Sequence, residues 1–308
     1  MIKRIFSCLL LLGATILAPA ADAIAQTLNV ASYNIRLANS RDTRQGDGWE
    51  QRVDCLCDVI RFSDFDIFGA QEVRHEQLAD MLARLPGYDY IGVGRDDGAT
   101  AGEYSPVFYK KSRFRLLDSG TFWLSETPDR VSKGWDAVCM RVCSWGYFRD
   151  NVTHKRFWFF NLHMDHRGIE ARRRSAQLIV DHIRKVCGTG ANVVLTGDFN
   201  VSQRNEIYST FADCGFLKDC YEAAAFRFAP SGTFNSFKPE NWSADRIDHI
   251  WVSSAATVER YGILTYHYWS AKDNEEGDAH DAPKEIRMEQ RRLRLPSDHY
   301  PVNVFVKF

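Results

Sequence analysis

VVLTGDFN, at residues 193–200, is an apolar run that ends in a polar cluster. Val193 to Leu195 has the composition of a buried strand, and Asp198 and Asn200 follow directly after it. Polar side chains at strand ends project from one edge of a sheet, where binding and catalytic sites are commonly built. The stretch therefore predicts a buried strand that carries site residues at its carboxyl end.

The same pattern recurs at five other places along the chain. The polar residues that end or interrupt apolar runs there are Asn34, Glu72, His163, Asp248 with His249, and Asp298 with His299. One polar strand end is usually a turn, but six clusters made only of Asn, Asp, Glu and His exceed what turns require. We expect them to meet at one edge of the fold and to form an active site.

Strands and helices alternate between these clusters. The predicted strands are 28–36, 66–73, 193–195, 247–252, 261–268 and 301–306, and hairpins are predicted over 107–124 and 138–163 with a turn near Asn151. Helical spacing predicts helices within 49–60 and 78–85 and over 169–187, the last with Ala176, Ile179, Val180, Ile183 and Val186 facing inward and Gly188 as its cap. This pattern predicts an α/β fold with two sheets and helices outside them.

The residue types of the clusters indicate their chemistry. Glu72, Asp198, Asp298, Asn34 and Asn200 offer only oxygen ligands, which hard cations such as Mg²⁺, Mn²⁺ and Ca²⁺ prefer. Histidines beside such a site suit proton transfer or hydrogen bonding to a developing anion. Together these groups predict metal-assisted phosphoester hydrolysis.

Six short motifs extend this pattern to nearly the whole chain. They are SYNIR (32–36), QE (71–72), NLHMDH (161–166), GDFN (197–200), RIDHI (246–250) and SDH (297–299). In composition and order they resemble the DNase I-like endonuclease/exonuclease/phosphatase superfamily. The resemblance implies a four-layer αββα sandwich, in which two packed mixed β-sheets are flanked by helices, and phosphoester cleavage with Mg²⁺ or Mn²⁺.

The resemblance also implies roles for the residues on the metal and water side. Glu72 would be the principal metal ligand, with Asn34 beside it and Asp298 completing that side. Asp198 would position or deprotonate the attacking water. Asn200 would hold the water or the phosphate.

A second group of residues would act on the phosphate. His299 would contact it, oriented by Asp248, and His163 would stabilise it from the other flank. Glu103 is placed by the resemblance as the carboxylate partner of His163. A histidine held by a carboxylate keeps one tautomer and a raised pKa, which suits contact with phosphate. The neighbouring His166 and His249 are expected to face away from the site and to be structural.

Candidate substrate-binding residues are fewer and less specific. Thr233 matches a family threonine near the phosphate. Phe234 and Trp242 lie in the loop before Asp248, where an aromatic ring could stack on a base or a sugar, although loop aromatics are more often packed anchors. Arg172 opens the helix after His166 and could clamp a second phosphate or a carboxylate.

The substrate class stays open at this stage. The stretches 133–141 and 166–172 look like a secreted bacterial branch of the superfamily, on the side of the deadenylases and nocturnin, so a nuclease or 3′–5′ exoribonuclease is an alternative to a small-molecule phosphodiesterase or phosphomonoesterase. The formal net charge of −1 argues against tight binding of duplex DNA. We expect a small phosphoester or a short nucleic acid as substrate, a monomer, and no protein partner.

Two readings of another class were weighed. Residues 161–166 nearly spell the zinc motif HxHxDH of metallo-β-lactamases, but Asn161 stands at the first histidine and GDFN and SDH would go unexplained. A non-catalytic binding module on the same fold should have lost a metal ligand or a phosphate-binding histidine, and none is missing.

The first 25 residues differ from the rest. Lys3 and Arg4 precede an apolar run over 5–17, and Ala23-Ile24-Ala25 resembles a signal peptidase site. This pattern predicts a signal peptide over 1–25, a single domain over 26–308 and a secreted or periplasmic protein. No interior run approaches the ~20 apolar residues of a membrane span. Seven cysteines follow residue 25, and only Cys214 with Cys220 forms a close pair for which a disulfide stays open.

One segment breaks the alternation of strands and helices. Residues 273–294 begin acidic and end basic, which is typical of a surface loop. The site motif at Asp298 follows directly, so a flap over the site is the functional alternative. The corresponding hypothesis is that one or more of Arg287, Arg291, Arg292 and Arg294 binds an anion of the substrate remote from the scissile bond.

Overall fold

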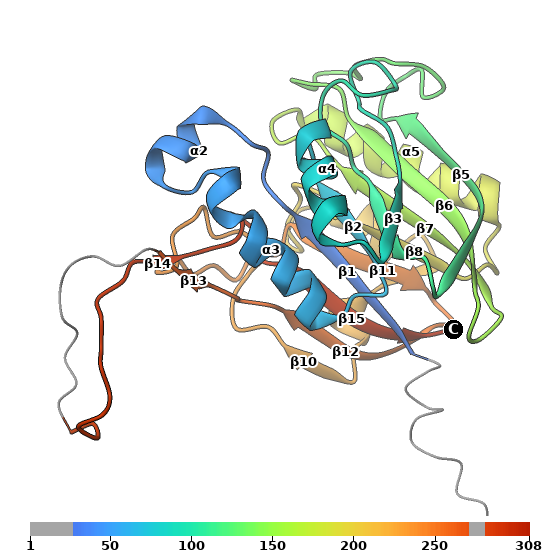
Figure 1. Ribbon diagram of the computed structural model, residues 1–308. Coiled ribbons are helices and arrows are strands. Elements are labelled where there is room, and N and C mark those ends of the chain that lie inside the picture. Colours follow the sequence, from blue (N-terminus) through green and yellow to red (C-terminus); the bar gives the residue numbers. More distant parts are fainter. Residues whose placement is uncertain (1–26, 271–280) are drawn as a thin grey trace, which may run out of the picture.

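Two mixed β-sheets pack face to face in the computed structural model, which describes residues 27–270 and 281–308. Helices cover the outer face of each sheet (Figure 1). The resulting order of layers is helix, sheet, sheet, helix, which confirms the predicted αββα sandwich. The expected signal peptide lies outside the described residues.

The first sheet has seven strands in the order β10-β12-β15-β1-β2-β4-β3. Their bounds are β1 Leu28–Asn34, β2 Ile67–Gln71, β3 Tyr88–Ile91, β4 Val107–Lys110, β10 Phe226–Phe228, β12 Thr257–Ile263 and β15 Val302–Lys307. The central strands β1 and β2 are parallel, with Asn34 opposite Gln71, whereas β15 runs antiparallel to β1.

The second sheet has six strands in the order β5-β6-β7-β8-β11-β9. Their bounds are β5 Phe114–Trp123, β6 Val142–Asp150, β7 Arg156–His163, β8 Val193–Asp198, β9 Leu217–Asp219 and β11 Asp248–Ser253. Strands β7 and β8 are parallel and β11 is antiparallel to β8. A separate two-stranded ribbon joins β13 Tyr268–Trp269 to β14 Leu293–Arg294.

The helices bury one face each against these sheets. α3 Trp49–Ser63 and α4 His75–Arg84 pack on the first sheet, and α5 Ile169–Cys187 and α6 Tyr208–Ala212 pack on the second. The short helices α2 Ser40–Gln45 and α7 Cys220–Ala223 belong to connecting segments. Gly188 ends α5 with φ of 73°, as the sequence predicts.

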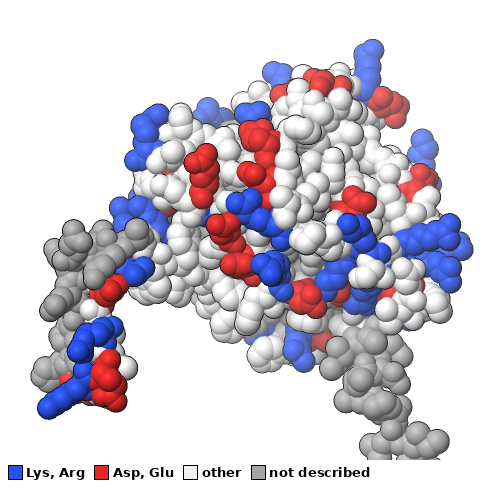
Figure 2. Space-filling view, viewed as in Figure 1, with Lys and Arg blue, Asp and Glu red and all other residues white. Residues whose placement is uncertain are grey.

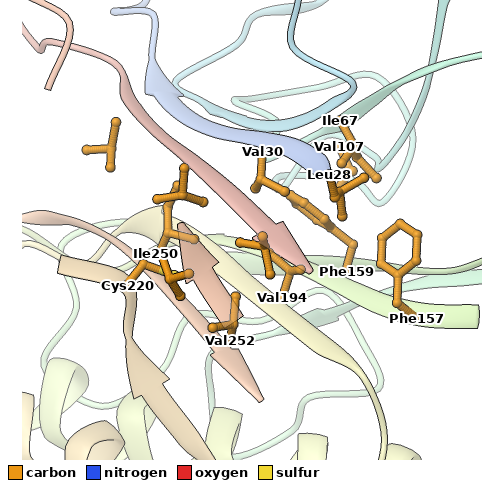
Figure 3. Packing of buried hydrophobic residues seen from close by; sticks show 14 of the residues in the cluster. Leu28, Val30, Ile67, Val107, Phe157, Phe159, Val194, Cys220, Ile250 and Val252 are labelled. Atoms are coloured by element: carbon orange, nitrogen blue, oxygen red, sulfur yellow. The ribbon is translucent and has the colours of Figure 1, made fainter. Parts of the chain in front are cut away.

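An apolar layer between the two sheets holds them together (Figure 3). Leu28 and Val30 of β1 point toward Phe159 and Val194 of the opposite sheet, and all four are buried. Burial of this apolar surface is the main force that docks one sheet on the other.

A polar bridge crosses between the sheets beside this layer. The Asn161 amide of β7 donates to the carbonyl oxygens of Ala70 (2.7 Å) and Pro106 (2.9 Å), and its oxygen accepts from Gln71 (2.7 Å). A Cβ at Gly69 would lie 2.2 Å from the Asn161 oxygen, so glycine is required there for the sheets to approach. Asn161 is thus a structural residue of the sheet interface.

Three predictions of local structure are wrong. The predicted hairpin over 107–124 does not form, because β4 and β5 belong to different sheets. The strand predicted over 261–268 begins at Thr257 and ends at Ile263. Val186 is 36% exposed rather than buried, because it lies near the end of α5 beyond the edge of the sheet cluster.

The hairpin of β6 and β7 and its turn near Asn151 are confirmed. The seven cysteines of the described chain are all free thiols, Cys214 and Cys220 included. None of the helices in the described part combines the length and the apolar character that a bilayer span requires.

Candidate active site

The parallel ends of β1 and β2 place two predicted site residues side by side. The Asn34 Nδ2 group donates to Glu72 Oε1 (3.1 Å) and to Asp198 Oδ2 (3.0 Å), which ties the first sheet to the second. Glu72 follows β2 with φ of 63°, a left-handed conformation that turns its side chain into the site. Its other oxygen accepts from the Leu37 backbone N–H (3.1 Å).

Strand register in the second sheet brings three more residues together. His163 lies opposite Asp198 on the parallel pair β7 and β8, and Asp248 lies opposite Asp198 on the antiparallel pair β8 and β11. His163 Nε2 is 3.5 Å from Asp198 Oδ2. Asn200 has φ of 50° and donates its backbone N–H to Asp198 Oδ1 (2.9 Å), which fixes the carboxylate.

His299 comes from the segment that leads into β15. Its Nδ1 is 2.9 Å from Asp248 Oδ2, and its Nε2 is 3.8 Å from Asp198 Oδ2. The expected histidine–carboxylate pair therefore forms. The expected partner of His163 does not: both oxygens of Glu103 accept from Arg95 (2.7 and 2.8 Å), and His163 Nδ1 has no hydrogen-bond partner.

These residues line a cavity of about 390 Å³. Among the predicted residues, those that line it are Glu72, Glu103, His163, Asp198, Asn200, Phe234, Asp298 and His299. Asn34 and Asp248 lie behind this surface and orient its members through the contacts given above. The sequence thus brought ten of its predicted residues to one place.

The pKa values of the buried groups differ because their partners differ. Burial alone would lower the pKa of His299, but the Asp248 carboxylate and its hydrogen bond outweigh it and raise the pKa to about 10. Burial and then the charge of Asp248 raise the pKa of Asp198 to about 7. Burial, followed by the charges of Arg141 and Arg95, holds the pKa of His163 well below its usual value, so the raised pKa expected for this histidine is wrong.

The donor set fits a divalent cation. Glu72, His163 and Asp198 each offer one ligand atom within 4.8 Å of the others, and Asp198, Asp248 and His299 form a second such group. Burial favours the neutral form of Glu72, but the charge of Arg36 outweighs it and lowers the pKa, so Glu72 is a carboxylate. Two carboxylates with one neutral imidazole are ligands that Mg²⁺ or Mn²⁺ accepts.

Asn34 and Asp298 stand differently toward such a cation. Asn34 presents its N–H₂ group, not its oxygen, to the carboxylates, and Asp298 belongs to neither group of close ligand atoms among the described residues. The ligand role of both residues stays a prediction.

Arg36 is a site residue that the sequence did not single out, although it ends the SYNIR motif. Its Nη1 lies 3.9 Å from Glu72 Oε2 and 3.6 Å from Asp298 Oδ2, and its Nε is 2.8 Å from Asp42. Arg36 thus places a positive charge between two carboxylates of the pocket. A cation in a run of strand residues that ends beside Asn34 was the available signal.

Arg52 of α3 was also missed, and it supports the site from below. This buried guanidinium donates to the carbonyl oxygens of Ile35, Arg36 (2.6 Å), Asp47 (3.1 Å) and Pro296 (3.0 Å). It therefore joins the segment after β1 to the segment that carries Asp298 and His299.

Replacing Arg52 by Met should lower the free energy of unfolding by at least about 3 kcal/mol, because four buried carbonyl groups would lose a charged donor. Urea denaturation followed by circular dichroism measures the change. Arg61→Met is the matched control, because Arg61 is exposed on the same helix, and its effect should stay within about 0.5 kcal/mol. A loss below about 1 kcal/mol for Arg52→Met would show that these bonds contribute little.

His166 and His249 differ from each other in the structure. His249 is buried and its Nε2 lies 2.8 Å from the Val201 carbonyl oxygen, as expected for a structural residue. His166 instead lines the pocket, and its Nδ1 lies 3.1 Å from Arg141 Nη2. The expectation for His166 is wrong because β7 ends at His163, so strand alternation no longer applies three residues later.

The candidate substrate-binding residues separate into two groups. Phe234 lines the pocket, with its ring edge 5.0 Å from the ring of His299. Thr233 is buried and its Oγ1 accepts from the backbone N–H groups of Ile247 (3.0 Å) and Asp248 (3.2 Å), so it holds the start of β11.

The other two candidates point away from the pocket. Arg172 donates to the Asp165 carbonyl oxygen (3.0 Å) and Trp242 to that of Pro230 (2.9 Å), and neither lines the cavity. Direct contact of Arg172, Thr233 or Trp242 with the substrate therefore has no support from the structure.

The four arginines of the charged segment also lie elsewhere. Arg294 pairs with Asp47 (2.8 Å), Arg291 pairs with Glu289 (2.8 Å), and none of the four lines the cavity. Residues 281–292 run away from the sheets at the left of Figure 1. The described part of this segment is therefore no flap over the site, and the structure favours an exposed charged insertion.

Comparison with solved structures gives two full-length matches. An endonuclease/exonuclease/phosphatase family protein from Bacteroides thetaiotaomicron is 48% identical, with a TM-score of 0.85, over 92% of this chain and 98% of that chain. A mannosyl-6-phosphatase from Bacteroides thetaiotaomicron VPI-5482 is 48% identical, with a TM-score of 0.84, over 91% of this chain and 100% of that chain.

Curated relatives are more distant. Nocturnin from Xenopus laevis is 23% identical over 225 residues, or 68% of this chain. An uncharacterized protein of Acanthamoeba polyphaga mimivirus is 29% identical over 163 residues, or 51% of this chain. The chain spans 55% and 60% of the length of these two relatives, respectively.

A family model settles the relationship. The model of the endonuclease/exonuclease/phosphatase family matches residues 28–299, a range that contains every residue of the site described above. The chain therefore belongs to the endonuclease/exonuclease/phosphatase family, whose members are hydrolases that act on phosphoester bonds.

Proposed function

We propose that this protein is a divalent-metal-dependent phosphomonoesterase that hydrolyses a small sugar phosphate. The observation that carries the proposal is the small cavity in which Glu72, Asp198, His163 and His299 meet. The full-length similarity to a mannosyl-6-phosphatase supports a phosphomonoester as substrate and a sugar as the leaving alcohol.

The residues of the cavity suit attack of water on phosphorus. Asp198, with a pKa of about 7, accepts the proton of the water near neutral pH. His299, with a pKa of about 10, is protonated and donates a hydrogen bond to a phosphate oxygen. Asn200 holds Asp198 in place through its backbone N–H.

Glu72, with Asp198 and His163, would hold the divalent ion on which the family generally depends. A bound Mg²⁺ or Mn²⁺ supplies charge stabilisation for the phosphate oxygens. The Asn34 N–H₂ group keeps the Glu72 and Asp198 carboxylates at the spacing that this requires.

A nuclease or exoribonuclease has less support. Phe234 is the one aromatic residue of the described chain that lines the cavity, whereas binding of single strands uses successive aromatic platforms and a basic groove. On the face shown in Figure 2, Lys and Arg are scattered among Asp and Glu. The similarity to nocturnin, at 23% identity, does not extend to a substrate.

Two further parts of the proposal concern the protein outside the site. A secreted or periplasmic location is supported by the basic start, apolar run and small residues within 1–25. A monomer acting on a small substrate agrees with a site built from the residues of one chain.

A substrate panel tests the proposed function. With Mg²⁺ or Mn²⁺ present, the purified protein should release phosphate from hexose 6-phosphates with a higher kcat/KM than from bis(p-nitrophenyl) phosphate, single-stranded RNA or duplex DNA. Inorganic phosphate release and product chromatography measure the rates. Faster cleavage of the diesters or nucleic acids would refute the proposal, and stoichiometric zinc in the purified protein would favour a different metal chemistry.

A further inference from the structure

One side of the cavity carries polar groups that the phosphate chemistry does not use. They are Arg95, Glu103, Arg141 and His166, and they are called the polar wall below. Arg95 and Glu103 come from the segment between β3 and β4, Arg141 precedes β6, and His166 follows β7. Different elements of the fold therefore converge to build this surface.

Arg95 and Glu103 form a fixed fork in the polar wall. Two guanidinium nitrogens donate to the two carboxylate oxygens at 2.7 and 2.8 Å, and the two side chains are only 13% and 12% exposed. The backbone also joins them, because the Arg95 N–H donates to the Glu103 carbonyl oxygen (3.1 Å). Each carboxylate oxygen keeps a further lone pair, so Glu103 remains able to accept hydrogen bonds in the cavity.

Arg141 offers donors beside this fork. It is 5% exposed, and its Nη2 contacts His166 Nδ1 (3.1 Å). Its Nη1 and Nε, and Nε of Arg95, are buried without a hydrogen-bond partner. Buried N–H groups are almost always paired in folded proteins, so these donors point to an acceptor that arrives with a ligand.

The balance of charge in the polar wall identifies the kind of ligand. Glu103 neutralises Arg95, and Asp165, which is 3.6 Å from Arg141 Nε, neutralises Arg141. A second anion would gain little net charge there and would face the Glu103 carboxylate. A hydroxyl group both donates and accepts, so neighbouring hydroxyls of a neutral polyol can bind Glu103 and Arg141 at the same time.

We propose that the polar wall binds hydroxyl groups of the leaving alcohol and thereby selects a hexose phosphate over an alkyl phosphate of similar size. The proposal rests on the proposed phosphomonoesterase function and names the residues that determine its specificity. Glu103 accepts from one hydroxyl and Arg141 donates to another. An ester without hydroxyls leaves these buried groups unpaired, which is a strong means of rejection.

Two esters with the same reacting group test this selection. A hexose 6-phosphate and cyclohexylmethyl phosphate are both primary phosphates on six-membered rings, but only the first carries hydroxyls. The readout is the ratio of their kcat/KM values, measured by phosphate release. Glu103→Gln and Arg141→Lys should each lower this ratio about 10- to 100-fold, because each removes a hydrogen bond to a charged group.

Matched controls come from surface residues of the same types. Glu206 pairs with Arg173 (2.6 Å) and Arg174 pairs with Glu170 (2.7 Å), both in exposed positions outside the cavity. Glu206→Gln and Arg174→Lys should leave the ratio within about twofold of wild type. Thermal melting checks that each variant is folded, and Glu103→Gln decides the outcome if Arg141→Lys is not.

The possible results separate the two proposals. A wild-type enzyme that hydrolyses the esters, with the same ratio in wild type and in Glu103→Gln, overturns the assignment of the polar wall and leaves the phosphomonoesterase function standing. A wild-type enzyme that hydrolyses neither ester overturns both proposals. A fall in the ratio confined to the Glu103 and Arg141 variants is the result that we expect.

Discussion

Asp198→Asn should lower kcat by at least about 100-fold while KM changes little, because the variant loses the group that accepts the proton of the attacking water. Asp198 is 2% exposed and contacts Asn34, His163 and His299, so no other carboxylate can take its position. Steady-state kinetics on the best substrate of the panel, with saturating metal ion, measures the effect. The same experiment applies to His299→Ala, for which a similar loss is expected.

A surface carboxylate provides the control for this prediction. Asp181 is exposed on α5 beside Arg184, and Asp181→Asn should keep wild-type kinetics. The Asp198 variant should also melt as a folded protein, since Asn has nearly the same shape. If Asp198→Asn kept more than about a tenth of wild-type kcat, the role given to this residue would be wrong.

Chelation should abolish activity, and Mg²⁺ or Mn²⁺ should restore it, with Glu72→Gln raising the required metal concentration by at least about tenfold. The reason is that Glu72 is a buried carboxylate in the group of close ligand atoms, and the amide of Gln is a neutral and weaker ligand. Activity as a function of metal concentration gives the shift. The rise in melting temperature on adding Mn²⁺ to the metal-free protein gives a second readout that does not depend on turnover.

Glu76→Gln is the control for this second prediction, because Glu76 is exposed in the first turn of α4, four residues after Glu72. It should leave both the metal requirement and the melting shift unchanged. Full activity in excess chelator would refute the metal-dependent mechanism, and an unchanged metal requirement in Glu72→Gln would remove this residue from the metal site.

The sequence predicted the catalytic centre well because strand ends carry most of it. Asn34, Glu72, His163 and Asp198 follow apolar runs whose parallel pairing brings carboxyl ends to one edge. That arrangement needs only the identification of strands, which period and composition supply.

The failures share a different physical cause. The segments around 107–124 alternate as a hairpin would, but alternation does not tell which sheet a strand joins, so the change of sheet between β4 and β5 was not foreseen. Glu103 was assigned to His163, although a loop that folds back on itself brings Arg95 closer. Contacts made by irregular loops depend on their conformation, which has no periodic signal in the sequence.

The layer of side chains between the two sheets has a consequence for turnover. Asn34, Glu72 and His299 stand on the first sheet and His163, Asp198 and Asp248 on the second, so the thickness of that layer is the ruler that sets every distance across the reacting centre. A displacement of 1 Å is enough to slow a positioned reaction by about 100-fold. Repacking Val30 against Val194 could therefore keep the melting temperature and still halt the enzyme. Selection on the rate of reaction thus restricts the volume of side chains that never meet the substrate.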